Sequence, residues 1–430
     1  MSDRLVVILL ACIGIVSVFI SSWMNTYVAI VSFFLYALSL TFFTQRAGAL
    51  GPLAWFPIFF FSYSSFYTLN LVFFSTNADV GATSIYLGHL ALLAFSLPIL
   101  GYYFVNGVSA KVLFYNFVKV PNWAFYVAWF FCLFLVFWVL FSGLRSKREV
   151  LDSLADTVFS KLFVFFVILG VMVFLRNLSL YCEKNKFFDL VAVLSIVVLF
   201  LGYGVTGERD YLFRYAFMFV VVYFLVKRKF NMLYPLLIVV VLGAVLPATQ
   251  ALKGVLIADS VDFGTVSQRS FFENEFSSAG RNLQYLLDSG ISQMRGVTYI
   301  WDLKRVTPFV DGQESAGRWF NDVLRHRYGD GGTSGWGFSL VAEGYMNFGY
   351  YGVFFQYLLI GFLTVIVFSV AQRGGFFLVF YVFYIASLIY VQRADMANYL
   401  GFCFKLNFTV VFFVYLCSKF GRFSSLGALK

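Results

Sequence analysis

A single glutamate, Glu343, lies in the otherwise uncharged segment GFSLVAEGYMNFGYYG at 337–352. A carboxylate in such a place can act as a general base or orient a hydroxyl group. Asn347 follows four residues later and therefore shares a helix face with Glu343. The aromatic residues around them, Tyr345 among them, are typical of a helix that enters a bilayer. The alternative is that Glu343 forms an ion pair with a nearby arginine and fixes a loop.

A second group of charges occupies the segment TGERDYLFR at 206–214. Arg209 and Asp210 lie in a turn between two apolar segments, and Arg214 follows one helical turn later, close to them by helical spacing. Charged groups at membrane depth are costly, and they usually line a pathway or a site. The alternative is a solvated turn whose acids pair with its own arginines.

Three more arginines are candidates because of where they lie. Arg269 and the Gly280–Arg281 pair belong to a long polar stretch, in which such spacing also arises by chance. Arg393 and Asp395 occupy a short turn between two apolar segments, where a surface ion pair is the simpler interpretation. Taken with the two groups above, they predict a cluster of charges at one depth on one side of a membrane.

Histidine and cysteine provide few candidates. His326 lies between two arginines in a loop, and histidine is the usual proton carrier near neutral pH, although a lone loop histidine is more often incidental. His89 falls inside an apolar run and predicts a packing hydrogen bond. The five cysteines lie in apolar runs, and no metal-binding spacing or nucleotide-binding loop is present, so we expect no metal, no cofactor and no disulfide.

The elements that position these residues follow from composition. The chain has 430 residues, of which 61% are hydrophobic and 12% are charged, with a mean hydropathy of +0.84. A water-soluble domain has roughly 45–50% apolar residues, so the excess must face lipid. The long unbroken apolar runs predict helices rather than the alternating strands of a barrel. The net charge of +10 fits cytoplasmic loops that hold positive charge, and nucleic acid is not expected as a partner.

Twelve apolar runs predict an all-α polytopic membrane protein with about 12 transmembrane helices. Alternation from a cytoplasmic N-terminus places both termini inside and most short basic segments inside. It divides the chain into an N-terminal bundle (1–248), a large periplasmic loop (249–336) and C-terminal transmembrane helices (337–430). The basic segment 143–161 falls outside by this count, so either it lies on the membrane surface or the count is wrong nearby. The predicted runs are 5–23, 26–44, 52–75, 84–105, 122–142, 162–181, 188–205, 211–226, 233–248, 350–371, 375–392 and 398–417.

These features together resemble the bacterial oligosaccharide repeat-unit polymerases, the O-antigen polymerase (Wzy) family. The resemblance in topology covers nearly the whole chain. The resemblance in motifs covers GERDYLFR after a span, Arg269 and Gly280–Arg281 in the late outer loop, and GFSLVAEGYMNFGYYG at its end. The last segment is the most specific of the three.

The resemblance implies a metal-independent inner-membrane glycosyltransferase of lipopolysaccharide or related polysaccharide biosynthesis that works at the periplasmic face. Its substrates would be undecaprenyl-pyrophosphate-linked oligosaccharides in contact with membrane lipids, and a chain-length regulator would be a partner. Glu343 or Asp210 would activate the attacking hydroxyl group, with His326 in reserve. Substrate binding would fall to Asn347, to Tyr345 against sugar or polyprenyl faces, and to arginines that neutralise the diphosphate, namely Arg209, Arg214, Arg269, Arg281 and Arg393.

Two other functions stay open from the sequence. An O-antigen ligase would share the topology and the donor but would depend on a loop histidine such as His326. A non-enzymatic flippase or exporter of lipid-linked oligosaccharide would carry charges along a path through the membrane. Here the charges concentrate at the predicted outer face, with Arg176 and Lys405 as the main deeper exceptions.

Overall fold

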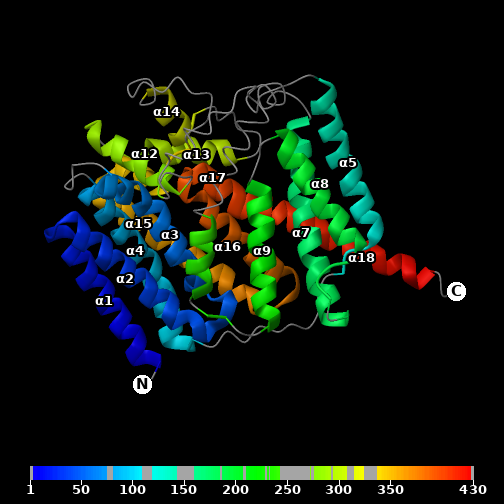
Figure 1. Ribbon diagram of the computed structural model, residues 1–430, viewed down its shortest axis with the longest axis horizontal. Helices are drawn as coiled ribbons and strands as arrows, with labels where there is room; N and C mark the ends of the chain where they lie inside the picture. Colours follow the sequence, from blue (N-terminus) through cyan, green and yellow to red (C-terminus); the bar gives the residue numbers. More distant parts are fainter. Residues whose placement is uncertain are drawn as a thin grey trace. The chain divides into compact units, whose positions relative to one another are not determined.

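The computed structural model of the chain is helical wherever it has regular structure among the residues that it describes (Figure 1). The predicted all-α class is confirmed to that extent. The described residues are 3–427, except 75–80, 109–118, 143–158, 185, 207–209, 228–229, 232, 243–271, 273–275, 292–293, 308–313 and 324–336. Most of the basic segment 143–161 therefore lies outside the described residues.

Nine helices in the described part of the chain are long and apolar enough to cross a membrane. The predicted runs 188–205, 211–226 and 233–248 are not among them, because their described helices are shorter or carry more charge. The count of twelve spans therefore stays a prediction. The nine helices are Asp3–Trp23, Thr26–Phe43, Pro52–Phe74, Ala82–Asn106, Asn122–Phe141, Phe163–Lys184, Leu340–Ala371, Gly375–Arg393 and Met396–Lys419.

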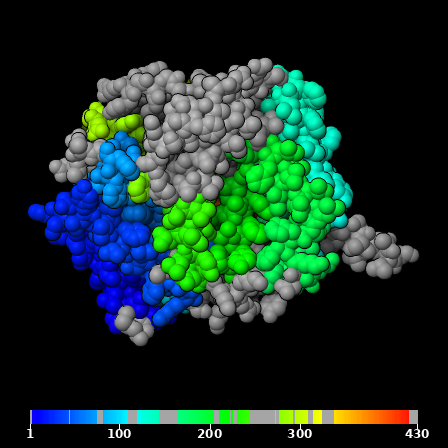
Figure 2. All heavy atoms as spheres, viewed as in Figure 1, coloured from blue at the N-terminus to red at the C-terminus, as the bar shows by residue number. Residues whose placement is uncertain are grey.

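These helices turn large apolar side chains outward. Helix α1 (Asp3–Trp23) alone exposes Leu5, Ile8, Leu9, Ile13, Ile15, Val16 and Phe19, and α1 and α2 (Thr26–Thr44) form part of the molecular surface, in dark blue in Figure 2. Water-soluble monomers rarely expose continuous apolar patches of more than a few hundred Å². The chain is therefore a multi-pass membrane protein.

The chain divides into two compact units, each built from separate segments. Unit 1 comprises Met1–Ala110, Lys229–Ser369 and Val391–Gly401. Unit 2 comprises Lys111–Arg228, Val370–Tyr390 and Phe402–Lys430. The division into an N-terminal bundle, a periplasmic loop and C-terminal helices follows membrane topology instead, so these units do not test it.

In unit 1, helix α3 (Pro52–Phe74) is the most enclosed element, packed between α2 and α4 (Ala82–Asn106). Helix α12 (Ser277–Asp288) also packs on α3. Gly280 permits this approach, because a Cβ atom there would lie 3.0 Å from the carbonyl oxygen of Ser64. A glycine directly before Arg281 thus has a packing reason in this fold.

Helix α15 (Leu340–Ala371) carries the segment that the sequence singled out, and it is interrupted by a kink at Phe348 and Gly349. Gly349 has a φ of 62°, a conformation that favours glycine. The predicted span at 350–371 therefore matches the second half of α15, and the first half is a short separate helix. At Gly352 a side chain would collide with the carbonyl oxygen of Gly344 across the kink.

Unit 2 contains α5 (Asn122–Phe141), α7 (Phe159–Lys184), α8 (Leu190–Thr206), α9 (Asp210–Lys227), α16 (Gly375–Tyr390) and α18 (Asn407–Gly427). Arg176 on α7 was one of the deeper charges of the sequence. It contacts both carboxylate oxygens of Asp189, with Nε 2.9 Å from each, and its Nη1 donates to Asn122 at 2.7 Å. The Arg176 guanidinium lowers the pKa of Asp189. This pair joins three helices of unit 2 and neutralises the arginine.

Candidate functional site

Glu343 lies in the first half of α15, and its side chain is 0% exposed. Its Oε1 accepts a hydrogen bond from Thr298 Oγ1 at 3.0 Å, and its Oε2 accepts one from the backbone N–H of Met396 at 2.6 Å. Thr298 belongs to α13 (Val297–Val306) and Met396 begins α17 (Met396–Leu400). The carboxylate thus ties three segments of unit 1 together.

Asn347 shares this network, as its spacing from Glu343 predicts. Its Nδ2 donates to Thr298 Oγ1 at 2.6 Å and to the carbonyl oxygen of Glu343 at 2.9 Å. Its Oδ1 accepts from the backbone N–H of Gly296 at 3.0 Å. The predicted common face of Glu343 and Asn347 is confirmed, and both side chains hold α13 against α15.

Asp302 is the residue of this network that the sequence analysis missed. It is fully buried on α13, beside the carboxyl group of Glu343. The backbone N–H groups of Ala316 and Ala397 lie near it, but without full hydrogen-bond geometry to either oxygen. Burial raises the pKa of Asp302, and the charge of Asp395 raises it further. A buried carboxyl group in this setting favours its protonated form.

Asp395 is not part of a surface ion pair, which corrects the simpler interpretation of its turn. It is 2% exposed and caps α17, because its Oδ1 accepts from the backbone N–H of Asn398 at 2.9 Å. Its Oδ2 accepts from the backbone N–H of Gly317 at 3.2 Å. The Asp395 carboxylate therefore holds the backbone at Asn398 and at Gly317, and its hydrogen bond to Asn398 sets the start of α17.

Among the described residues no basic side chain pairs with Glu343, so the arginine ion pair considered for it is not found. Both carboxylate oxygens already have partners, and neither reaches open space. In this structure Glu343 holds neighbouring elements in place. Its assignment as a base stays a prediction that would require the Thr298 or Met396 contact to open.

Arg281 and Arg393 both belong to unit 1. The backbone of Phe338 links their segments through two hydrogen bonds. Asn282, next to Arg281, donates from Nδ2 to the carbonyl oxygen of Phe338 at 3.3 Å. The backbone N–H of Phe338 donates to the carbonyl oxygen of Arg393 at 2.8 Å. Both arginine side chains are half-buried. The fold thus brings the beginning of α15, α12 and the turn at Arg393 together.

Tyr345 lies on the side of the kink that carries Glu343, and its ring is 5.7 Å from that of Tyr350 on the other side. The two rings meet edge to face, at 81°. This is a favoured arrangement for aromatic pairs. Tyr345 therefore helps to define the angle between the two halves of α15.

Arg214 is the most buried of the described candidate arginines, and it belongs to unit 2. Its side chain is 1% exposed, and its Nη2 donates to Asp210 Oδ2 at 2.9 Å. The rings of Phe402, Tyr390 and Phe383 surround the guanidinium carbon at 4.4, 5.5 and 5.7 Å. The pairing of acid and arginine within the segment is thus found, but in a buried setting and not in a solvated turn.

Two N–H positions of Arg214, Nε and Nη1, are buried and have no acceptor among the described residues. A buried donor without an acceptor is rare in native proteins, where ordered water or an ion commonly satisfies such groups. An anion with several oxygens would satisfy both positions. Arg214 is therefore the candidate residue whose geometry indicates a ligand most directly.

The remaining candidates, Arg209, Arg269 and His326, lie outside the described residues.

Within the described ranges no three histidine, cysteine, aspartate or glutamate side chains are placed to hold a metal ion. Thr298 and Asp302 could have been found from the sequence, because they are four residues apart on a short helix and share one face.

No family model, no curated protein and no solved structure matches the chain.

Proposed function

We propose that this chain is an inner-membrane glycosyltransferase that polymerises undecaprenyl-pyrophosphate-linked oligosaccharide repeat units at the periplasmic face, with both termini in the cytoplasm. The observation that carries the proposal is the Arg214 guanidinium group, held in a cage of aromatic rings with two buried donors that have no acceptor among the described residues. The sequence resemblance supplies the substrate class.

In the proposed reaction a hydroxyl oxygen of the acceptor repeat unit attacks the anomeric carbon of the donor. The new glycosidic C–O bond forms as the bond from the anomeric carbon to the diphosphate oxygen breaks. Undecaprenyl pyrophosphate leaves with the electron pair, and Arg214 stabilises the negative charge that develops on it. Asp210, whose side chain is 20% exposed, accepts the hydroxyl proton once its contact with the backbone N–H of Tyr211 or with Arg214 opens.

The paired state of Arg176 favours a transferase over an exporter. An exporter of a charged lipid would carry charges spread along a path through the membrane, and those that meet the lipid would have to exchange their protein partners for it. Arg176 is one of the deeper charges of the chain, and its guanidinium group already forms an ion pair with Asp189 and a hydrogen bond with Asn122. The described residues thus give no support to a charged path through this helix.

A deletion strain tests the proposal through its polysaccharide ladder. Loss of a polymerase leaves single capped repeat units, loss of a flippase leaves no surface sugar, and loss of a ligase leaves polymer that never reaches lipid A–core. In a complemented strain Arg214→Ala should abolish long chains, because one removed donor group costs about 10²–10³ in rate. Arg214→Lys should keep part of the ladder.

Arg318→Ala is the matched control, because that arginine side chain is 56% exposed and its ion pair with Asp322 is long, at 3.9 Å. It should give a wild-type ladder. A wild-type ladder from Arg214→Ala at normal membrane levels would overturn the role of Arg214. An unchanged ladder in the deletion strain would overturn the proposed function itself.

A further inference from the structure

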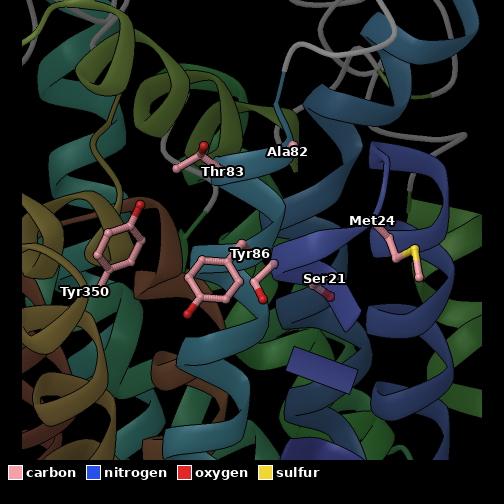
Figure 3. A pocket seen from close by; sticks show the side chains of 7 residues that line it. Ser21, Met24, Ala82, Thr83, Tyr86 and Tyr350 are labelled. Carbon is pink, nitrogen blue, oxygen red and sulfur yellow. The ribbon is translucent and has the colours of Figure 1, made fainter. Parts of the chain in front are cut away.

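A pocket of about 330 Å³ opens in unit 1 between the end of α1, the beginning of α4 and the second half of α15. Figure 3 shows the rings of Tyr86 and Tyr350 beside each other, with Thr83 and Ser21 around the same space. Its volume falls within the range of small-molecule sites, roughly 300–1,000 Å³. Tyr350, 46% exposed, leaves the pocket accessible from outside.

Hydroxyl groups dominate the lining of this pocket. Five of its seven lining residues carry one: Ser21, Ser22, Thr83, Tyr86 and Tyr350. The other two are Met24 and Ala82, so no lining residue is charged. A diphosphate or a phospholipid headgroup would need cationic donors. The hydroxyl groups of Ser21 and Ser22 bond within the protein, to Ser17 and Phe19, so the polar contacts to a ligand would come mainly from Thr83, Tyr86 and Tyr350. The lining fits an uncharged ligand that is rich in hydroxyl groups.

The walls of the pocket are held by contacts that do not involve a ligand. The rings of Tyr86 and Tyr350 meet at 5.6 Å and 67°. Ser21 Oγ is hydrogen-bonded to His89 Nδ1 at 2.8 Å and donates to the carbonyl oxygen of Ser17 at 2.9 Å. Side chains that are fixed before binding lower the entropy cost of association.

We propose that this pocket binds a neutral sugar ring of the acceptor repeat unit. Hydroxyl groups both donate and accept hydrogen bonds and so match the hydroxyl groups of a sugar. The tyrosine rings offer flat apolar faces to its C–H groups, while their own hydroxyl groups stay available. This inference rests on the proposed function, and it adds the place where the neutral part of the acceptor lies.

The first test measures binding to the full-length protein in lipid nanodiscs. The probe is the oligosaccharide released by mild acid from the lipid-linked repeat unit that a deletion strain accumulates. The wild-type protein should bind it, and Tyr350→Leu should weaken binding roughly 2- to 12-fold, the range for loss of one aromatic contact. Thr83→Val, which removes one hydroxyl group at nearly constant shape, should also weaken it.

Tyr351→Leu is the matched control, since Tyr351 is the next residue along α15, is 76% exposed and does not line the pocket. It should bind the probe as the wild type does. Equal weakening by Tyr351→Leu would indicate general adhesion to surface tyrosines and would overturn the proposal. The proposal would also be overturned if the wild-type protein did not bind the probe. It would be overturned as well if vesicles of phosphatidylglycerol competed with the probe for binding. If Tyr350→Leu does not fold, Tyr350→Phe, which keeps the ring, and Thr83→Val decide the outcome.

The second test separates this inference from the proposed function. Tyr350→Leu in the complemented strain should shift the ladder towards short chains. If deletion changes the ladder but Tyr350→Leu and Thr83→Val both restore the wild-type pattern, the pocket proposal fails and the proposed function stands. If deletion itself leaves the ladder unchanged, the proposed function fails.

Discussion

Replacement of Thr298 by valine removes one hydroxyl group at nearly constant volume from the centre of the network around Glu343. In the native protein this hydroxyl donates to Glu343 Oε1 at 3.0 Å and accepts from Asn347 Nδ2 at 2.6 Å. Asn347 keeps its bond to the carbonyl oxygen of Glu343. Glu343 Oε1 then loses the hydrogen bond that attaches it to α13 through Thr298, and its buried carboxyl group is left with Met396 and the neighbouring Asp302.

Removal of one partner from a buried hydrogen bond costs about 1–3 kcal/mol. Because the lost bond attaches α13 to α15, we expect the cost to appear as easier local opening of α13. At 1.4 kcal/mol per factor of ten, amide exchange in residues 297–306 should become roughly 5- to 150-fold faster. Hydrogen–deuterium exchange with mass spectrometry of the protein in detergent measures this directly.

Thr307→Val is the control, because the Thr307 hydroxyl donates to the carbonyl oxygen of Leu303 on the exposed end of the same helix. It should change exchange in α13 by no more than about twofold, as surface substitutions do. Thr298→Ser keeps the hydroxyl and should restore most of the protection. Unchanged exchange in Thr298→Val would refute the view that this hydroxyl fastens α13.

Two further substitutions test the surroundings of this network. Burial raises the pKa of Asp302, so this carboxyl favours the native state below its unfolded pKa of about 3.9, and that contribution is lost as pH rises through the folded pKa. Asp302→Asn should therefore raise the melting temperature relative to wild type at pH 8, with the difference vanishing towards acid pH, and a pH-independent difference would contradict it. Gly352→Ala should lower the melting temperature, because its Cβ would collide with the carbonyl oxygen of Gly344 and overpacking costs about 1–3 kcal/mol. Gly101→Ala, where nothing lies within 4 Å, should not lower it, and equal melting temperatures of the two variants would contradict the collision.

Local features of the fold could be predicted from the sequence because they depend on neighbours along the chain. Apolar runs of span length predicted twelve helices, nine of which are long and apolar enough to cross a membrane in the described part of the chain, since lipid-facing backbone must be satisfied within the helix. The four-residue spacing of Glu343 and Asn347 predicted their common face. The proximity of Asp210 and Arg214 followed in the same way.

The partners that decide the chemistry could not be predicted, because they come from distant segments. Glu343 meets Thr298 and Met396, which are 45 and 53 positions away in the chain. Asp395 looked like a surface acid from its turn, yet a backbone N–H 78 positions away, at Gly317, helps to bury it. Helical periodicity carries no information on such contacts.

The contacts of Glu343 also change what a glutamate in GFSLVAEGYMNFGYYG is expected to do. Its two oxygens hold the first half of α15 to α13 and to the N-terminus of α17. The kink at Gly349 follows, and Tyr345 and Tyr350 lie on its two sides with their rings 5.7 Å apart. Because Tyr350 also lines the pocket, the hydrogen bonds of Glu343 help to set the position of that ring through the backbone of α15. We therefore expect a substitution of Glu343 to change sugar binding through the backbone geometry of α15, whether or not Glu343 also accepts a proton.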